Sequence, residues 1–130
     1  MDMKLELVPL PVSDVDAAKA FYADSLGFTV DVDVTPAPGI RVVQVTPPGS
    51  SCSLGFGTGL PVYGGEPGSV RGLHLVVNDI EAARAELLGR GVDVGDITDA
   101  GGGVLYAGLH DPDGNSLVLQ QMPWRTGDAF

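Results

Sequence analysis

The sequence predicts an α+β fold made of two βαβββ repeats, whose curved mixed sheets surround a trough. The main observation is internal repetition: three segments of the 130-residue chain match three others without gaps when the chain is shifted by half its length. Three matches at one shift indicate a duplication, because a single short match arises easily by chance. The aligned pairs are LVPLPVSD (7–14) with GLHLVVND (72–79), DVDAAKA (14–20) with DIEAARA (79–85), and TPPGSSCSL (46–54) with DPDGNSLVL (111–119).

Each half begins with a strand in which apolar residues alternate, and an aspartate then starts a helix. Asp14 and Asp79 stand one residue before segments with apolar residues on one helical face, which predicts helices over 15–25 and 80–89. A glycine closes each helix, as is common at helix C-termini. The alternating apolar positions of the first strands are Val8, Leu10 and Val12 in one half and Leu73, Leu75 and Val77 in the other.

Three further strands complete each half, and the whole chain, 1–130, is expected to be one domain with halves of about 4–57 and 70–122. The segment 57–72 between them is rich in Gly and Pro, which predicts a linker without regular structure. One helix covers only one face of a four-stranded sheet, so two such sheets are expected to pair and leave a trough for a small molecule. The further strands are predicted over 28–34, 40–46 and 52–57, and over 92–97, 103–109 and 116–122.

The composition narrows the classes of partner. The chain has 17 acidic and 7 basic residues and a formal net charge of -10, so it repels phosphate backbones and no nucleic-acid partner is expected. The same charge would attract a cationic ligand, and the alternative is that it serves only to keep the protein soluble. No apolar run is long enough to span a bilayer, so no membrane partner is expected. The single cysteine, Cys52, excludes an internal disulfide and fits a cytoplasmic location.

These segments resemble the vicinal oxygen chelate superfamily, the group of glyoxalases, bleomycin-resistance proteins and extradiol dioxygenases, in its single-domain bacterial form. The resemblance covers about residues 4–122. It implies the paired βαβββ fold and a homodimer with its pocket near the interface between chains. It does not select an activity, because this scaffold carries many chemistries. The motifs that carry the resemblance are LPVSDVDAAKAFYADSLGF (10–28), LVVNDIEAARAELLGRGV (75–92) and DPDGNSLVL (111–119).

In the metal-dependent members of that superfamily, each half supplies one ligand from its first strand and one from its last. Carried over to this sequence, the four ligand positions are Leu7, Ser53, Gly72 and Val118. Three of them have no donor in the side chain, and a serine hydroxyl is a poor ligand for Zn²⁺, Fe²⁺ or Mn²⁺. We therefore expect no metal site and no cofactor.

His74 lies close to one of these positions, on the same predicted strand face as Gly72 and Val76. Three roles stay open for it: a metal ligand in a shifted register, a general acid or base, and a hydrogen-bonding or structural group in the pocket. His110 directly precedes the DPDGN turn and is expected to brace that turn or face solvent. The first-strand residues expected to face the same cavity as His74 are Leu7, Pro9 and Pro11.

The sequence leaves open whether the chain is an enzyme, and no residue is assigned a catalytic role. The first hypothesis is a metal-free protein that holds an aromatic or cationic small molecule in the trough, as drug-sequestering members of the resembling family do. The alternatives are a metal-dependent lyase, isomerase or dioxygenase that uses His74, and a catalytically silent partner or subunit. The candidate ligand-binding residues are His74, Arg41, Tyr63, Tyr106, Gln120, Trp124, Leu7 and Val118.

Overall fold

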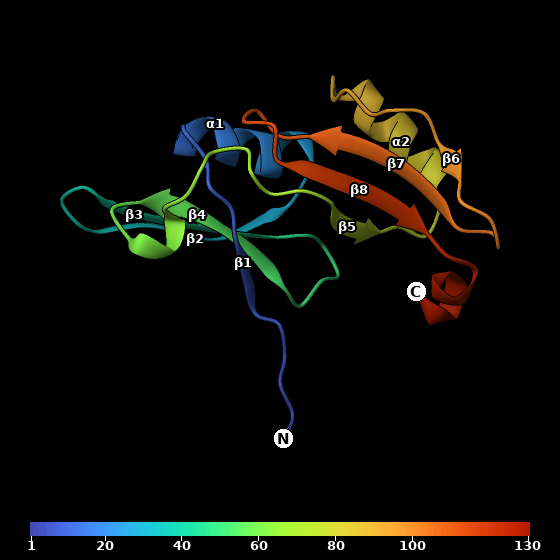
Figure 1. Ribbon diagram of the computed structural model, residues 1–130, viewed down its shortest axis with the longest axis horizontal. Helices are drawn as coiled ribbons and strands as arrows, with labels where there is room; N and C mark the ends of the chain where they lie inside the picture. The colour runs from blue at the N-terminus through green and yellow to red at the C-terminus, as the bar shows by residue number, and fades with distance from the viewer. The chain divides into compact units, whose positions relative to one another are not determined.

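The chain folds into two βαβββ modules, and each module carries a four-stranded mixed sheet and one main helix (Figure 1). The computed structural model describes all residues, Met1–Phe130. The first unit contains Met1–Ser69 together with the loop Asp111–Gly114, and the second contains Val70–His110 and Asn115–Phe130. The predicted α+β class with two βαβββ repeats is therefore confirmed.

In the first unit the strands run in the order β1-β4-β3-β2, with β1 parallel to β4 and the other pairs antiparallel. The helix starts as α1 (Val15–Lys19) and continues as the π-helical turn η1 (Ala20–Ser25), so it spans the predicted range. It starts there because the Asp14 carboxylate accepts a hydrogen bond from the backbone amide of Ala17 at 3.1 Å. The strands are β1 (Leu7–Pro9), β2 (Thr29–Ala37), β3 (Ile40–Thr46) and β4 (Ser53–Thr58).

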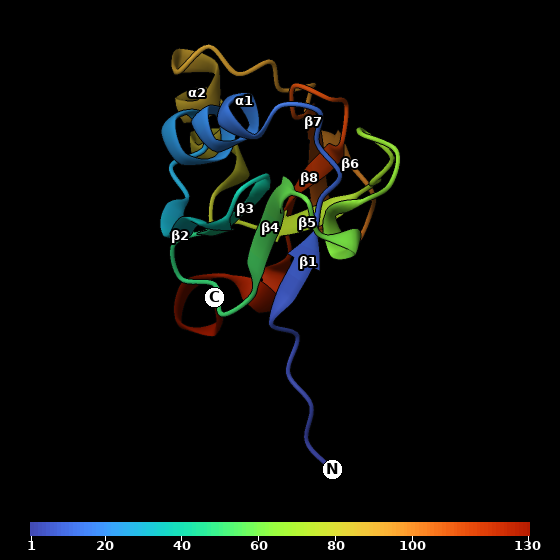
Figure 2. The ribbon, with the colours of Figure 1, turned by 90° about the vertical axis from the view of Figure 1, so that its left-hand side faces the viewer.

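The helix of the first unit covers one face of its sheet, and Figure 2 shows it above β2, β3 and β4. The core lies between the two, where Tyr22 and Phe56 are fully buried and their rings lie 5.9 Å apart. The hydroxyl of Tyr22 donates a hydrogen bond to the carboxylate of Asp111 at 2.9 Å. Burial and the Asp111 carboxylate both raise the pKa of Tyr22 far above that of an exposed phenol, so Tyr22 keeps its proton and remains the donor.

In the second unit the strand order is β5-β8-β7-β6, with β5 parallel to β8. Helix α2 (Ile80–Gly89) has the predicted bounds, because Asp79 caps it by accepting a hydrogen bond from the amide of Ala82 at 3.1 Å. Two 3₁₀ turns, η3 (Pro123–Arg125) and η4 (Gly127–Ala129), follow the last strand. None of the helices combines the length and the apolar character that crossing a membrane requires. The strands are β5 (Leu73–Val76), β6 (Thr98–Asp99), β7 (Leu105–His110) and β8 (Ser116–Gln121).

The prediction of a strand over 92–97 is wrong, and the short strand β6 takes its place. Val92 and Val94 are buried, as their alternation indicates, but the segment that carries them does not form a strand. The side chain of Arg84 in α2 donates hydrogen bonds to two carbonyls of this segment. Its Nε lies 2.7 Å from the carbonyl oxygen of Gly95, and its Nη2 lies 3.4 Å from the carbonyl oxygen of Val94. The amide of Gly95 donates to the carbonyl of Gly108 in β7 at 2.9 Å, but the paired ladder with β7 starts only at Thr98.

The segment 57–72 also departs from expectation, because it contains a 3₁₀ turn, η2 (Pro61–Tyr63). The turn is closed by a hydrogen bond from the amide of Tyr63 to the carbonyl of Leu60 at 3.0 Å. Proline suits the first residue of such a turn, since its φ is already fixed near the helical value and no amide hydrogen is lost from a ladder.

The pairing of strands also corrects the gap-free alignment of the two halves. Leu7 is the partner of Ser53 in the first sheet, whereas the partner of Val118 in the second is His74. Ser53 and Val118 match at the half-chain shift, so the structural counterpart of Leu7 is His74 and not Gly72. The helices and last strands keep the predicted alignment, and the first strands differ from it by two residues.

The connection from the first strand to the helix accounts for this difference. It uses residues 77–78 in the second half, where the first half uses 10–13. The connection is therefore shorter by the same two residues, and the helices keep the common alignment. Before β5, the backbone turns at Gly72, which has a positive φ of 74°.

Candidate functional site

The second sheet has one buried face and one face that points away from α2. Leu109, Leu117 and Leu119 line the buried face, and Gln121 continues this alternation with its side chain bonded to the start of α2. The strand register places two rows on the opposite side, which we call the outer face. These rows are His74–Val118–Gly108 and Val76–Gln120–Tyr106.

His74 is exposed, and its ring makes two contacts within the second unit. Its Nδ1 lies 2.6 Å from the carbonyl oxygen of Gly72. The ring meets that of Tyr106 edge-on, with centroids 6.0 Å apart and an angle of 88° between the planes. The hydroxyl oxygen of Tyr106 in turn accepts a hydrogen bond from Nε2 of Gln120 at 3.2 Å. Three predicted binding residues thus form one cluster, with Val118 beside it in the register.

The role of Gly72 in this cluster was missed by sequence reasoning, which assigned it only as an absent metal ligand. Its carbonyl holds the imidazole of His74, and its positive φ is what turns the backbone at this point. The signal available in the sequence was a glycine two residues before a histidine on a strand, which has many other meanings.

Leu7 and Tyr63 lie in the first unit, on the face of the first sheet that points away from its helix. A Cβ atom built on Gly55 would lie 2.9 Å from Cδ1 of Leu7 and 3.4 Å from Cε1 of Tyr63. A Cβ atom on Gly57 would lie 3.0 Å from Cδ2 of Tyr63. The tyrosine ring therefore rests directly on two glycines of β4, which explains the glycines of the GFGTG segment by close packing.

Arg41 is placed on the other side of the first sheet, in line with the buried residues Val43 and Val45. Its guanidinium donates hydrogen bonds to both carboxylate oxygens of Asp33, at 3.1 Å and 3.0 Å. It also donates to Oδ1 of Asp16, at 2.6 Å. Hydrogen bonds from Arg41, and then from Lys19, lower the pKa of Asp33 to about 2. The bonds to Asp33 and Asp16 account for a charged residue in this apolar strand, so Arg41 is not part of the candidate site.

Trp124 and His110 also belong to the second unit and are exposed. Trp124 lies in η3, directly after the last strand, and 61% of its surface is accessible. His110 ends β7, opposite Ser116 of β8. Neither residue lies in the two rows that define the outer face.

The residues at the expected ligand positions do not fit a transition metal. Leu7 and Ser53 pair in the first sheet, and the hydroxyl of Ser53 lies 2.6 Å from that of Thr46. In the second sheet His74 pairs with Val118, so an imidazole stands beside a side chain without a donor. No three His, Cys, Asp or Glu side chains come together in the structure. A single imidazole is far from the three or four ligands of such sites.

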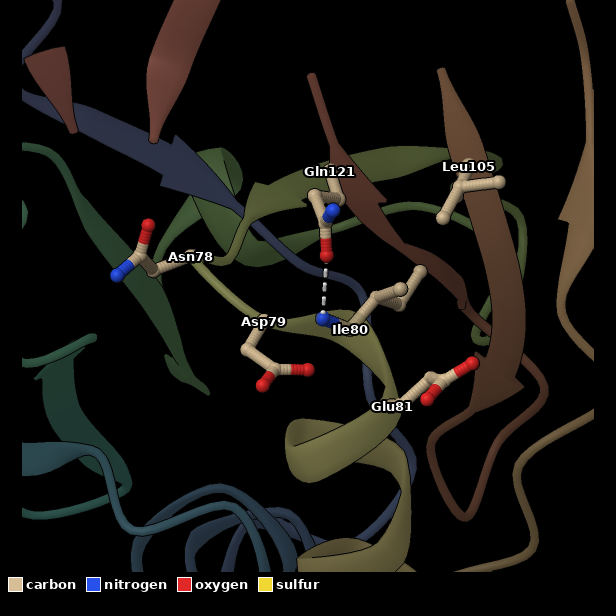
Figure 3. A pocket seen from close by; sticks show the side chains of 6 residues that line it. All are labelled: Asn78, Asp79, Ile80, Glu81, Leu105 and Gln121. Atoms are coloured by element: carbon tan, nitrogen blue, oxygen red, sulfur yellow. Dashed lines mark hydrogen bonds between the residues drawn. The ribbon is translucent and has the colours of Figure 1, made fainter. Parts of the chain in front are cut away.

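A pocket of about 440 Å³ opens at another place in the second unit, beside the first turn of α2 (Figure 3). Figure 3 shows Gln121 pointing to the helix start, where its Oε1 accepts a hydrogen bond from the amide of Ile80 at 2.8 Å. Asp79 and Glu81 make this rim negative, and no aromatic ring or predicted binding residue lines it. We interpret the arrangement as helix capping. The lining residues are Asn78, Asp79, Ile80, Glu81, Leu105 and Gln121.

Comparison with known proteins places this geometry in a family. A family model described as the Glyoxalase/Bleomycin resistance protein/Dioxygenase superfamily matches residues 4–119. Among solved structures, TnmS3, an antibiotic binding protein from Streptomyces sp. CB03234, is 36% identical with a TM-score of 0.80, over 93% of this chain and 97% of its own. A glyoxalase/bleomycin resistance protein from the same organism is 37% identical with a TM-score of 0.75, over 91% of this chain and 100% of its own.

A member of the same superfamily from Sphaerobacter thermophilus DSM 20745 is 31% identical with a TM-score of 0.77, over 92% of this chain and 98% of its own. No curated protein sequence matches the chain. The family model covers most of both halves, including the first strands, the helices and most of the last strand. The chain therefore belongs to the Glyoxalase/Bleomycin resistance protein/Dioxygenase superfamily, as the resemblance of its repeated segments predicts.

Proposed function

We propose that this chain is a small-molecule-binding protein that works without a metal and holds an aromatic or cationic ligand on the outer face of the second sheet. The observation that carries the proposal is the cluster of His74, Tyr106 and Gln120 on that face, with Val76 and Val118 beside it. Rings and apolar side chains offer a surface for stacking, and the polar groups orient a ligand by hydrogen bonds.

Two further observations support this proposal. TnmS3, whose sequence is 36% identical to this chain, is an antibiotic binding protein. The net charge of -10 favours ligands with positive charge, because the potential of the whole chain attracts them. Neither observation depends on a metal.

Replacing His74 by alanine is expected to weaken ligand binding by about 1–2 kcal/mol, or roughly 5- to 30-fold in Kd, the scale of a lost hydrogen bond. The fold should persist, because the side chain is exposed. A thermal-shift screen of aromatic antibiotics and aromatic metabolites identifies a ligand, and titration calorimetry then compares the two proteins. Leu88→Ala on the exposed side of α2 is the control and should bind as the natural chain does. A ligand bound equally well by His74→Ala argues against this face.

The metal-dependent alternative has one observation in its favour. His74 occupies the register position of Leu7, beside Val118, where the superfamily resemblance expects a first-strand ligand. A lyase, isomerase or dioxygenase would then need its other ligands from groups that the two pairs of strands do not supply. Elemental analysis of the purified protein decides between the two functions. We expect no Zn, Fe or Mn at stoichiometric level, and a full equivalent that disappears in His74→Ala supports the enzyme instead.

We also propose that the chain forms a homodimer. The first sheet ends in two edge strands, β1 and β2, and Val30 and Val34 of β2 are exposed. Free edges and exposed apolar residues favour association with another chain. Light scattering at about 10–50 μM, well above the Kd of a stable dimer, should give twice the mass of the chain. A monomeric mass at these concentrations contradicts the proposal.

A further inference from the structure

The contact between His74 and Gly72 determines which nitrogen of the imidazole carries the proton. Nδ1 lies 2.6 Å from a backbone carbonyl oxygen, which is an acceptor and never a donor. Nδ1 is therefore the protonated nitrogen. In the neutral imidazole the other nitrogen, Nε2, then has a lone pair and no hydrogen. Toward a ligand, neutral His74 is a hydrogen-bond acceptor.

The contact between Gln120 and Tyr106 determines the direction of the second polar group. The amide Nε2 of Gln120 donates to the hydroxyl oxygen of Tyr106 at 3.2 Å. A tyrosine hydroxyl accepts and donates at the same time, so its own hydrogen remains for a different partner. Toward a ligand, Tyr106 is a hydrogen-bond donor.

The two groups belong to neighbouring rings on one face. Their centroids are 6.0 Å apart, and the apolar Val118 and Val76 stand in the same two rows. An aromatic ligand that lies against these rows meets an acceptor on His74 and a donor on Tyr106. A site built to hydrogen-bond a particular group discriminates strongly against analogues that lack it, because the polar groups of the site are then unpaired.

We propose that the outer face of the second sheet selects aromatic ligands that carry both a hydroxyl and a carbonyl group. The ligand hydroxyl donates to Nε2 of His74, and the ligand carbonyl accepts from the hydroxyl of Tyr106. This inference rests on the proposed function, since it names the class of ligand for the same site. Gly72 and Gln120 are positioning residues that set the direction of the two bonds.

The first arm of the test needs no ligand. Long-range proton–nitrogen NMR spectra of the ¹⁵N-labelled full chain report the tautomer of each imidazole. The chain has two histidines, and His110→Gln assigns the signals of His74. We expect His74 to carry its proton on Nδ1. A neutral His74 with its proton on Nε2 overturns the inference and leaves the proposed function standing.

The second arm compares three flavonoid probes that differ in one group each. The probes are a hydroxyflavanone whose hydroxyl is too far from its carbonyl to bond it internally, its methyl ether, and the matching hydroxyflavan, which has CH₂ in place of the carbonyl. The natural chain should bind the hydroxyflavanone about tenfold more tightly than either of the others, which is the size of one hydrogen bond.

Two variants separate the two groups. His74→Phe keeps an aromatic ring but loses the acceptor, so the preference for the hydroxyl over its methyl ether should fall from about tenfold to none. Tyr106→Phe should abolish the preference for the flavanone over the flavan and keep the preference for the hydroxyl. Equal binding of hydroxyl and methyl ether by the natural chain, or flavanones that fail to bind while other aromatics bind in a His74-dependent way, overturns the inference. If no aromatic compound binds at all, the proposed function fails as well.

Discussion

Replacing Asp111 by alanine is expected to lower the free energy of unfolding by about 3 kcal/mol. Asp111 is buried and accepts hydrogen bonds from the hydroxyl of Tyr22 and from the amide of Asp113, both at 2.9 Å. The hydroxyl of Tyr22 is fully buried, so removal of this partner leaves a buried donor without its acceptor. Urea denaturation measures the effect as a lower midpoint with an unchanged slope.

Tyr22→Phe is the matched variant, because it removes the hydroxyl and keeps the ring in the core. Its expected loss is smaller, about 1.5 kcal/mol, since Asp111 keeps its bond to the amide of Asp113. In the double variant the two losses should not add, as is usual for residues in direct contact. An Asp111→Ala protein within about 0.5 kcal/mol of the natural chain would show that this bond contributes little.

Replacing Gly57 by alanine is expected to cost about 3 kcal/mol or more. The added methyl group would lie 2.0 Å from the carbonyl oxygen of Arg41. That oxygen belongs to the backbone of the neighbouring strand β3, so it cannot rotate away as the end of a side chain can. The same methyl group would press on the ring of Tyr63 at 3.0 Å. Either β3 and β4 separate locally or the ring leaves the sheet.

Gly108→Ala provides the control within the same protein. Gly108 also lies inside a strand, β7, but apart from its two neighbours in the chain no residue has an atom within 4 Å of the position of its Cβ. Alanine there should be neutral or stabilise by up to about 1 kcal/mol, since glycine weakens a strand interior. Comparable melting temperatures for the two variants would show that the close approach at Gly57 is relieved without cost.

The sequence predicted both helices with correct bounds because each begins at a capping aspartate, which is a local signal. It also predicted Val76 on the same face of β5 as His74, which the pairing with β8 confirms. It failed on the register of the first strands, and the physical reason is the period of the strand. A shift by two residues leaves every side chain on the same face, so alternation cannot distinguish Gly72 from His74 as the counterpart of Leu7. Register depends on pairing with β8, which is distant in the chain.

The candidate site was predicted to a similar extent. His74, Tyr106, Gln120 and Val118 were each named from the sequence, and the pairing of β5, β7 and β8 places them together in the two outer rows. Arg41 could not be placed from the sequence, since β3 is apolar at both alternate positions and its parity is ambiguous. Its partners, carboxylates 8 and 25 residues away in the chain, became visible only in the folded unit.

The contact of the Tyr63 ring with β4 distinguishes the first half of the chain from the second, so the two halves have diverged since the duplication. In the first half, Gly55 and Gly57 leave space above β4, and the side chain of Tyr63 packs into it. At the half-chain shift, Gly55 and Gly57 correspond to Gln120 and Met122 in the second half. In the first copy this part of the outer surface is thus covered by a side chain of the same unit. If the second copy binds the ligand as proposed, it is the copy whose outer face must suit that ligand. Divergence between relatives of this chain should therefore concentrate in the second copy.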